Sequence, residues 1–259
     1  MESEIFEQRM LAQGWALFPG VVPARELERL RRDVLASVAD CGRRQVDGRV
    51  GEAPDGTAHH AVGQYDSFDE FLDHGWLEEH IDGFFGGAPF ILHAFNPATV
   101  APACSSYLHR IHRDVRTHAG GFRMLVNMLV MVDAFSLENG ATYVLSGSHH
   151  EAEAPDEARF WREADRLVGP AGSIVLFDSN LWHAAGANQS NAPRAALTLS
   201  YSRAFIKQQM DYPRFLGPAY GQALSPRMRQ RLGYNAMVPC TYEEWYRPRA
   251  ERLYQADQG

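Results

Sequence analysis

The stretch Gly172–Tyr201, GSIVLFDSNLWHAAGANQSNAPRAALTLSY, contains two apolar segments on either side of a polar turn. The first segment, 174–177, is continuously apolar, and polar and aromatic residues that include His183 follow it. The second segment opens with Arg194, eleven residues after His183, and runs to residue 202. Short apolar runs bounded by turn residues are typical of strands. The stretch therefore predicts two strands with a histidine and an arginine near their ends.

Similar short apolar runs continue after Pro89, and glycine, asparagine and proline residues separate them. The expected strands cover residues 90–95, 122–132, 141–145, 173–177 and 195–202. Helical periodicity is found at 24–38 and 67–85, and further helices are expected within 155–167 and at 226–232. The polar, glycine-rich segment 41–57 predicts a loop or an irregular hairpin. This pattern predicts a mainly β protein with helices (α+β), either a β-sandwich or an open barrel, which carries a helical layer.

The 259-residue chain has an ordinary globular composition, with 45% hydrophobic and 22% charged residues. Its net charge of −7, without a basic run, argues against nucleic acid as a partner, and no apolar stretch approaches the roughly 18 residues of a membrane span. Three cysteines, none in a CxxC motif, suit reduced thiols in the cytoplasm. With no repeat or linker, we expect one domain, 1–259, made of N-terminal helices (1–88), a β core (89–207) and a C-terminal tail (208–259).

Eleven histidines raise the question of metal binding. Facial iron sites use two imidazoles and one carboxylate, and a His-x-Asp pair on a strand points both side chains to one face. The pattern His-x-Asp or His-x-Glu occurs at 80–82, 112–114 and 149–151. The first lies on an expected helix, where residues two apart diverge, and the last lies in an expected turn. His112 and Asp114 precede the most apolar strand. With His183 as a third ligand and Arg194 as a partner for a carboxylate, they predict a metal site.

At this point the sequence resembles the phytanoyl-CoA dioxygenase-like branch of the iron(II)/2-oxoglutarate-dependent oxygenases. The matching motifs are HRD at 112–114, ENGATYVLSGSHH at 138–150, LWHAAGAN at 181–188, and Arg194 followed by ALTLSY. The segments GWALFPGVVPARELERLR at 14–31 and LGYNAMVPCTYEEWYRP at 232–248 are also similar. The resemblance runs from about Phe6 to Pro248 and is weakest across 41–80.

The resemblance implies a double-stranded β-helix (jelly-roll, cupin-like) core with helices packed on the outside of one sheet. It implies that His112, Asp114 and His183 hold Fe(II), and that Arg194 pairs with the distal carboxylate of the cosubstrate 2-oxoglutarate. Related halogenases have Gly or Ala at the position of Asp114, so the resemblance argues against halogenation.

Four polar residues on neighbouring strands are further candidates for contact with 2-oxoglutarate. Asn127 lies on the strand after the His-x-Asp motif, on the side that the resemblance turns toward the cosubstrate. Asn96, on the preceding strand, is a candidate of the same type. Thr198 and Ser200 share a strand face with Arg194 and are expected to add hydroxyl contacts.

The resemblance implies a dioxygenase that uses O2, hydroxylates an unactivated C–H bond of a small molecule, and releases succinate and CO2. The expected substrate is a natural product or an amino-acid derivative, and no protein general base is required. The expected protein is a monomer or a homodimer without nucleic-acid or membrane partners. Residues near the motifs that are candidates for substrate contact are Tyr107, His109, Arg116, Arg203 and Lys207.

Several alternatives remain open from the sequence. Desaturation, cyclisation or epimerisation would follow from the same oxidising chemistry, and a jelly-roll protein that binds a ligand without turnover is a rival of another class. A zinc hydrolase would also use two histidines and a carboxylate, but it would leave Arg194 and the NGAT run unexplained. A serine hydrolase is not expected, because the chain lacks a GxSxG motif.

Overall fold

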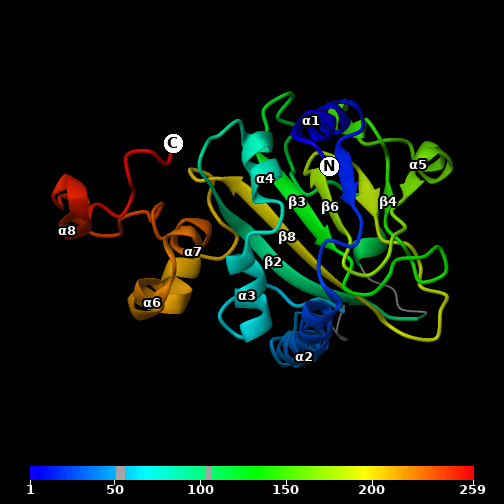
Figure 1. Ribbon diagram of the computed structural model, residues 1–259, viewed down its shortest axis with the longest axis horizontal. Helices are drawn as coiled ribbons and strands as arrows, with labels where there is room; N and C mark the ends of the chain where they lie inside the picture. Colours follow the sequence, from blue (N-terminus) through cyan, green and yellow to red (C-terminus); the bar gives the residue numbers. More distant parts are fainter. Residues whose placement is uncertain (51–55, 103–106) are drawn as a thin grey trace.

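The computed structural model describes residues 1–50, 56–102 and 107–259. Its centre is a pair of antiparallel sheets, one of five strands in the order β1-β6-β3-β8-β2 and one of three strands in the order β5-β4-β7 (Figure 1). The strands are β1 (Trp15–Phe18), β2 (Phe90–Val100), β3 (Leu125–Val130), β4 (Tyr143–Val144), β5 (Asp165–Arg166), β6 (Ile174–Asp178), β7 (His183–Ala184) and β8 (Arg194–Arg203). The expectation of a jelly-roll core is confirmed.

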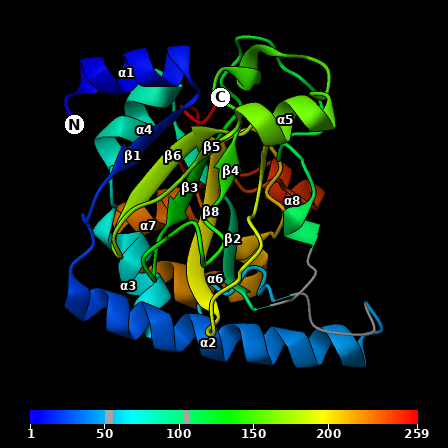
Figure 2. The ribbon, with the colours of Figure 1, turned by 90° about the vertical axis from the view of Figure 1, so that its right-hand side faces the viewer.

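Helices surround these sheets, and most of them lie on one side of the five-stranded sheet. Those before the core are α1 (Ser3–Ala12), α2 (Ala24–Asp47), α3 (Asp66–His74) and α4 (Glu78–Phe85). Those after it are α6 (Tyr212–Ala223), α7 (Pro226–Arg231) and α8 (Tyr242–Trp245), while α5 (Glu157–Glu163) lies near the three-stranded sheet. Figure 2 shows α2 running beneath the sheets as a long, straight helix.

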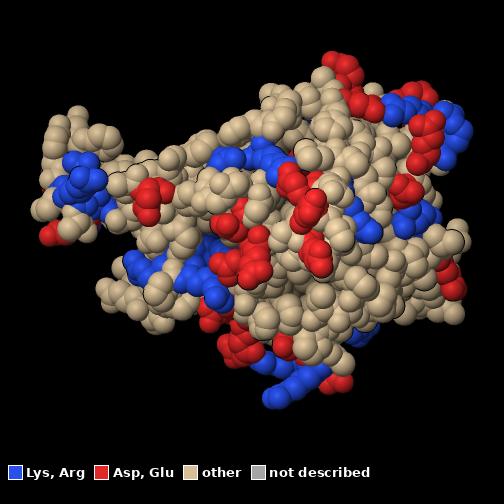
Figure 3. Space-filling model, turned by 45° about the horizontal axis from the view of Figure 1, so that its top comes forward, with Lys and Arg blue, Asp and Glu red and all other residues tan. Residues whose placement is uncertain are grey.

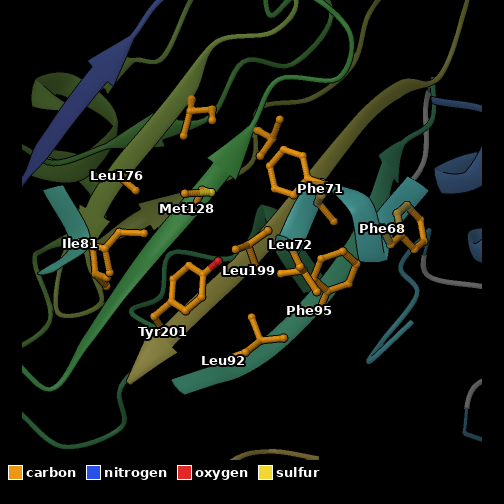
Figure 4. Packing of buried hydrophobic residues seen from close by; sticks show 14 of the residues in the cluster. Phe68, Phe71, Leu72, Ile81, Leu92, Phe95, Met128, Leu176, Leu199 and Tyr201 are labelled. Atoms are coloured by element: carbon orange, nitrogen blue, oxygen red, sulfur yellow. The ribbon is translucent and has the colours of Figure 1, made fainter. Parts of the chain in front are cut away.

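The alternation of side chains along β8 separates the hydrophobic core from the interior of the jelly roll. Leu197, Leu199 and Tyr201 join the core beneath the helices. There Phe68 of α3 packs on Phe95 of β2, with ring centroids 5.3 Å apart, in the cluster shown in Figure 4. Because side chains alternate along a strand, Arg194 and every second residue after it point to the other face, between the two sheets.

The helical part of the sequence departs from expectation in three places. The predicted helix 67–85 is two helices, because the chain turns through positive φ at Gly75 (73°) and Leu77 (55°). The predicted loop 41–57 begins only after Asp47, because α2 continues through residues 41–47; residues 51–55 lie outside the described part. Helix α6 was not expected, since Gly217 and Pro218 interrupt its helical pattern.

The surface of the molecule carries charges of both signs. On the face shown in Figure 3, Lys and Arg side chains lie among Asp and Glu side chains. Among the residues that the structure describes, no helix is both long and apolar enough to cross a membrane.

Candidate metal centre and adjoining cavity

His112, Asp114 and His183 come together between the two sheets, with one ligand atom from each lying within 4.8 Å of the others. Nε2 of His112 is 3.8 Å from Oδ1 of Asp114, and Nε2 of His183 is 3.8 Å from Oδ2 of the same carboxylate. The two imidazole centroids are 4.3 Å apart. Two imidazoles and one carboxylate converging in this way form a donor set that suits a divalent iron site with open positions.

Backbone hydrogen bonds, rather than a regular strand, bring the ligands together. The N–H of His112 donates to the carbonyl of His183 (3.0 Å), and the N–H of His183 donates to the carbonyl of His112 (2.8 Å). Asp114 lies in a bend, where its N–H donates to the carbonyl of Ser179 (3.1 Å). The His-x-Asp motif precedes β3, as expected from the sequence, and is not part of a regular strand: His112 makes an isolated bridge to His183 and the chain then bends.

Both imidazoles are fixed in the tautomer that metal binding requires. Nδ1 of His112 donates to the carbonyl of Arg110 (2.7 Å), and Nδ1 of His183 donates to the carbonyl of Leu181 (2.9 Å). Burial, together with neighbouring His112, lowers the pKa of His183, so its ring is neutral. A histidine whose Nδ1–H is held by a carbonyl offers the lone pair of Nε2, as metal-ligating histidines commonly do. The residues present thus fit a bound metal dication.

Arg194 is buried close to these three ligands, and the described residues include no counter-ion paired with it. Arg194 is 4% exposed, and its Nε and Nη1 have no hydrogen-bond partner among the described residues. Its guanidinium lies 3.6 Å from the ring centroid of Phe135. Nearby Asp133 instead accepts hydrogen bonds from the N–H of Ala195 and from Nε of Arg31.

Burial lowers the pKa of Arg194 to about 9, with Asp133 opposing the shift and Arg166 adding to it. The guanidinium therefore stays protonated at neutral pH. A buried cation that lacks an anionic partner is costly, because it has lost its hydration and gained nothing in return. Arg194 consequently fits a ligand that brings a carboxylate into the cavity.

One cavity of about 400 Å³ joins the three ligands to Arg194. Several sequence-predicted residues line it together with them, namely Asn96, Asn127, Thr198, Ser200, Tyr107 and Arg116. The predicted common face of Arg194, Thr198 and Ser200 is found, and Asn127 also points into the cavity. The roles of these residues in binding 2-oxoglutarate or substrate stay predictions.

Three predicted substrate contacts are not among the residues lining this cavity. Arg203 is nine residues after Arg194 on the same strand, so it points to the opposite face, where Nε donates to the carbonyl of Arg123 (3.1 Å). Lys207 lines a separate hollow with Phe205 and Met237. His109 ends a short 3-10 turn, Tyr107–His109, of which only the first two residues line the cavity.

His93 lines the cavity, and the sequence did not single it out. The register of β2 against β8 shifts between Leu92, which pairs with Tyr201, and Ala94, which pairs with Ser200. This bulge inserts His93 as an extra residue, and Nδ1 of its imidazole has no hydrogen-bond partner among the described residues. Burial lowers its pKa, which favours the neutral ring. A histidine inside the apolar run FILHAF was the available signal.

Cations outnumber carboxylates around the cavity. Asp114 is the only acidic residue among the described residues that line it, whereas Arg113, Arg116 and Arg194 all do so. Nη1 of Arg113 donates to the carbonyl of Glu151 (3.2 Å), and its guanidinium lies over the ring of Trp182. The lining therefore favours anionic ligands, in a protein whose net charge is −7.

A family model described as phytanoyl-CoA dioxygenase (PhyH) matches residues 10–196, which span β1, the three candidate ligands and Arg194. The chain belongs to the phytanoyl-CoA dioxygenase family. The resemblance seen in the sequence is thus confirmed, and the cavity of this PhyH chain is lined by residues from four of the matching motifs, among them His112, Thr142, His183 and Arg194.

The PhyH chain is similar to curated and solved proteins. It is 38% identical to the uncharacterized protein Rv1501 of Mycobacterium tuberculosis over 170 residues, 66% of this chain and 61% of that protein. The matched part is therefore about three fifths of that relative. EctD from S. alaskensis, solved with 2-oxoglutarate and 5-hydroxyectoine, is 20% identical with a TM-score of 0.64 over 78% of this chain and 76% of EctD. The epimerase SnoN, solved with Fe3+, alpha ketoglutarate and nogalamycin RO, is 17% identical with a TM-score of 0.60 over 86% of this chain and 92% of SnoN. Both likenesses are of fold.

Proposed function

We propose that this protein is an iron(II)- and 2-oxoglutarate-dependent dioxygenase that hydroxylates a C–H bond of a small molecule. The observation that carries the proposal is one cavity that contains both the His112–Asp114–His183 donor set and the buried cation of Arg194, whose Nε and Nη1 have no hydrogen-bond partner among the described residues. A metal site alone suits many activities, and a buried arginine alone suits many anions. Together they match a cosubstrate that chelates a metal at one end and carries a free carboxylate at the other.

The chain's own residues divide the work between holding and orienting. His112, Asp114 and His183 would occupy one face of the iron and leave the other positions for ligands. Arg194 would fix the distal carboxylate of 2-oxoglutarate and thereby its orientation. When bound, iron(II) and 2-oxoglutarate would supply, with O2, an oxidant for C–H bonds, and succinate and CO2 would be released. Leu125, Leu129 and Phe177 line the cavity and would limit access of water.

The substrate is proposed to be a small natural product or an amino-acid derivative. A cavity of about 400 Å³ falls within the usual range of small-molecule sites and must also hold the cosubstrate. The arginines of its lining support a substrate with an anionic group, and His93 offers a hydrogen bond from the sheet. Desaturation, cyclisation and epimerisation would use the same site and differ only in the product.

The test is an anaerobic titration of metal-free protein with Fe(II) and then with 2-oxoglutarate. We expect a visible charge-transfer absorption band that requires both additions and is missing in Asp114→Ala and in His183→Ala. Arg203→Ala is the matched control, since this side chain lies on the opposite face of β8 and should leave the band unchanged. Folded wild-type protein that binds Fe(II) but gives no band with 2-oxoglutarate would overturn the proposal. Zn(II)-dependent hydrolysis without any band would favour the hydrolase instead.

A further inference from the structure

The two histidines and Asp114 are held in place in different ways. Each imidazole is fixed locally, by the carbonyl of the residue two positions before it. The carboxylate of Asp114 has no such local support, since it lies in a bend and its side chain is 35% exposed. One hydrogen bond from the described residues reaches it: Nδ2 of Asn127 donates to Oδ2 over 2.7 Å.

Asn127 is a rigid anchor for that bond. It is 1% exposed and lies in β3, which is paired with a strand on each side, so that Phe177 of β6 and Ser200 of β8 lie opposite it. The identity of the facing atom follows from chemistry, because an amide oxygen 2.7 Å from a carboxylate would be repelled. Asn127 therefore presents its N–H to Asp114.

We propose that Asn127 is a positioning residue, which holds the Asp114 carboxylate toward Nε2 of both histidines and so prepares the metal site. This inference rests on the proposed function of the site. It differs from the expectation drawn from the sequence, in which Asn127 contacts 2-oxoglutarate. If Asn127 positions Asp114, its loss lowers the affinity for the metal. If Asn127 contacts the cosubstrate, its loss lowers the affinity for 2-oxoglutarate instead. One set of variants therefore separates the two roles.

The effect of losing the hydrogen bond follows from the position of Asp114. Without Asn127, the partly exposed carboxylate of Asp114 is free to rotate into solvent, and metal binding has to restrict it again. Removal of a group that orients a metal ligand typically lowers metal affinity by about 10- to 100-fold. We expect a loss in this range for Asn127→Leu, a change that keeps the side-chain volume of a buried position. The affinity of the metal-loaded protein for 2-oxoglutarate should stay within about threefold.

The probe is Co(II), whose ligand-field absorption reports the geometry of its ligands and which does not turn over in anaerobic buffer. Its dissociation constant and its spectrum at saturation are measured for wild type, Asn127→Leu and Asn127→Ser. The serine variant retains a polar group too short to reach Asp114 and guards against misfolding of the leucine variant. Asn96→Leu is the matched control, because Asn96 lines the same cavity but pairs with His59 (3.4 Å).

The expected result is weaker Co(II) binding and an altered spectrum in both Asn127 variants, with neither change in Asn96→Leu. Thermal unfolding of the metal-free Asn127 variants should stay cooperative, since Asn127 does not belong to the hydrophobic clusters that hold the sheets and helices together. Unchanged Co(II) affinity, with or without a drop in 2-oxoglutarate affinity, would overturn the positioning role; a drop would assign Asn127 to the cosubstrate. If the His183→Ala variant bound Co(II) as tightly as wild type, the metal site would be refuted, and with it both proposals.

Discussion

Replacing Arg194 by leucine should weaken cosubstrate binding without weakening the fold. Arg194 is 4% exposed, and two of its guanidinium nitrogens have no partner among the described residues, so a carboxylate would find donors ready for it. A charge-assisted hydrogen bond contributes about 1.5–3 kcal/mol. At about 1.4 kcal/mol for each factor of ten, a single lost bond raises the dissociation constant of 2-oxoglutarate about 10- to 140-fold.

The stability of the ligand-free protein should respond in the opposite sense. The lowered pKa of Arg194 reflects the cost of burying its charge unpaired, and leucine carries no such cost. Replacing buried charges by apolar side chains is often neutral or stabilising. We therefore expect an unchanged or higher melting temperature for Arg194→Leu, with each kcal/mol corresponding to about 2–4 °C in a chain of this size.

The assay combines the anaerobic Fe(II)/2-oxoglutarate titration with thermal unfolding in the absence of ligands. Arg203→Leu is the matched control, because it removes an arginine from the same strand but from the face that packs under the helices. Its cosubstrate affinity should equal that of wild type. The reasoning would be refuted if Arg194→Leu bound 2-oxoglutarate like wild type, or if it unfolded several degrees earlier in the absence of ligand.

Two further substitutions test the fold around the site. Gly14→Ala should destabilise the protein by more than about 1 kcal/mol in urea unfolding, because φ is +82° and the new Cβ would lie 2.5 Å from Nδ1 of His149. Gly20→Ala is the control and should destabilise the protein less, since φ is +60° and no atom lies within 4 Å of the new Cβ. Equal losses of stability in the two variants would contradict this account. Burial and the neighbouring His59 and His93 lower the pKa of His60 to about 4. As the pH falls below about 6.5, His60 is protonated in the unfolded chain before it is protonated in the folded protein. The free energy of unfolding should therefore decrease between about pH 6.5 and 4, by at most about 3 kcal/mol. His60→Asn, which tolerates the positive φ of this position, should flatten that slope, and an unaltered slope would show that His60 is not its source.

The sequence was most informative where spacing alone defined the chemistry. His112, Asp114, His183 and Arg194 were identified from their types and intervals, and the structure brings all four into one cavity. The His-x-Asp motif lies ahead of the apolar strand, as expected, and its ligands converge because an isolated backbone bridge joins His112 to His183.

The features of the site that the sequence analysis mispredicted or missed have separate physical origins. Arg203 lies nine residues from Arg194 on the same strand, and residues an odd number apart point to opposite faces. Its absence from the cavity could therefore have been predicted from the sequence. The position of His93 depends on a bulge, which is a property of the pairing between two distant strands and has no local sequence code. The hydrogen bond between Asn127 and Asp114 joins a strand to a bend, and its existence depends on how the intervening segment folds back.

The bulge in β2 also bears on how this cavity can change during evolution. Leu92 and Ala94 already pair with the consecutive residues Tyr201 and Ser200, so a chain lacking His93 would close the gap into an uninterrupted ladder. Loss of one codon would then delete an imidazole from the cavity without reversing the facing of any other residue in the strand. A jelly roll built in this way can gain or lose a polar group in the cavity of its candidate metal centre in a single genetic step, while its hydrophobic core is inherited intact.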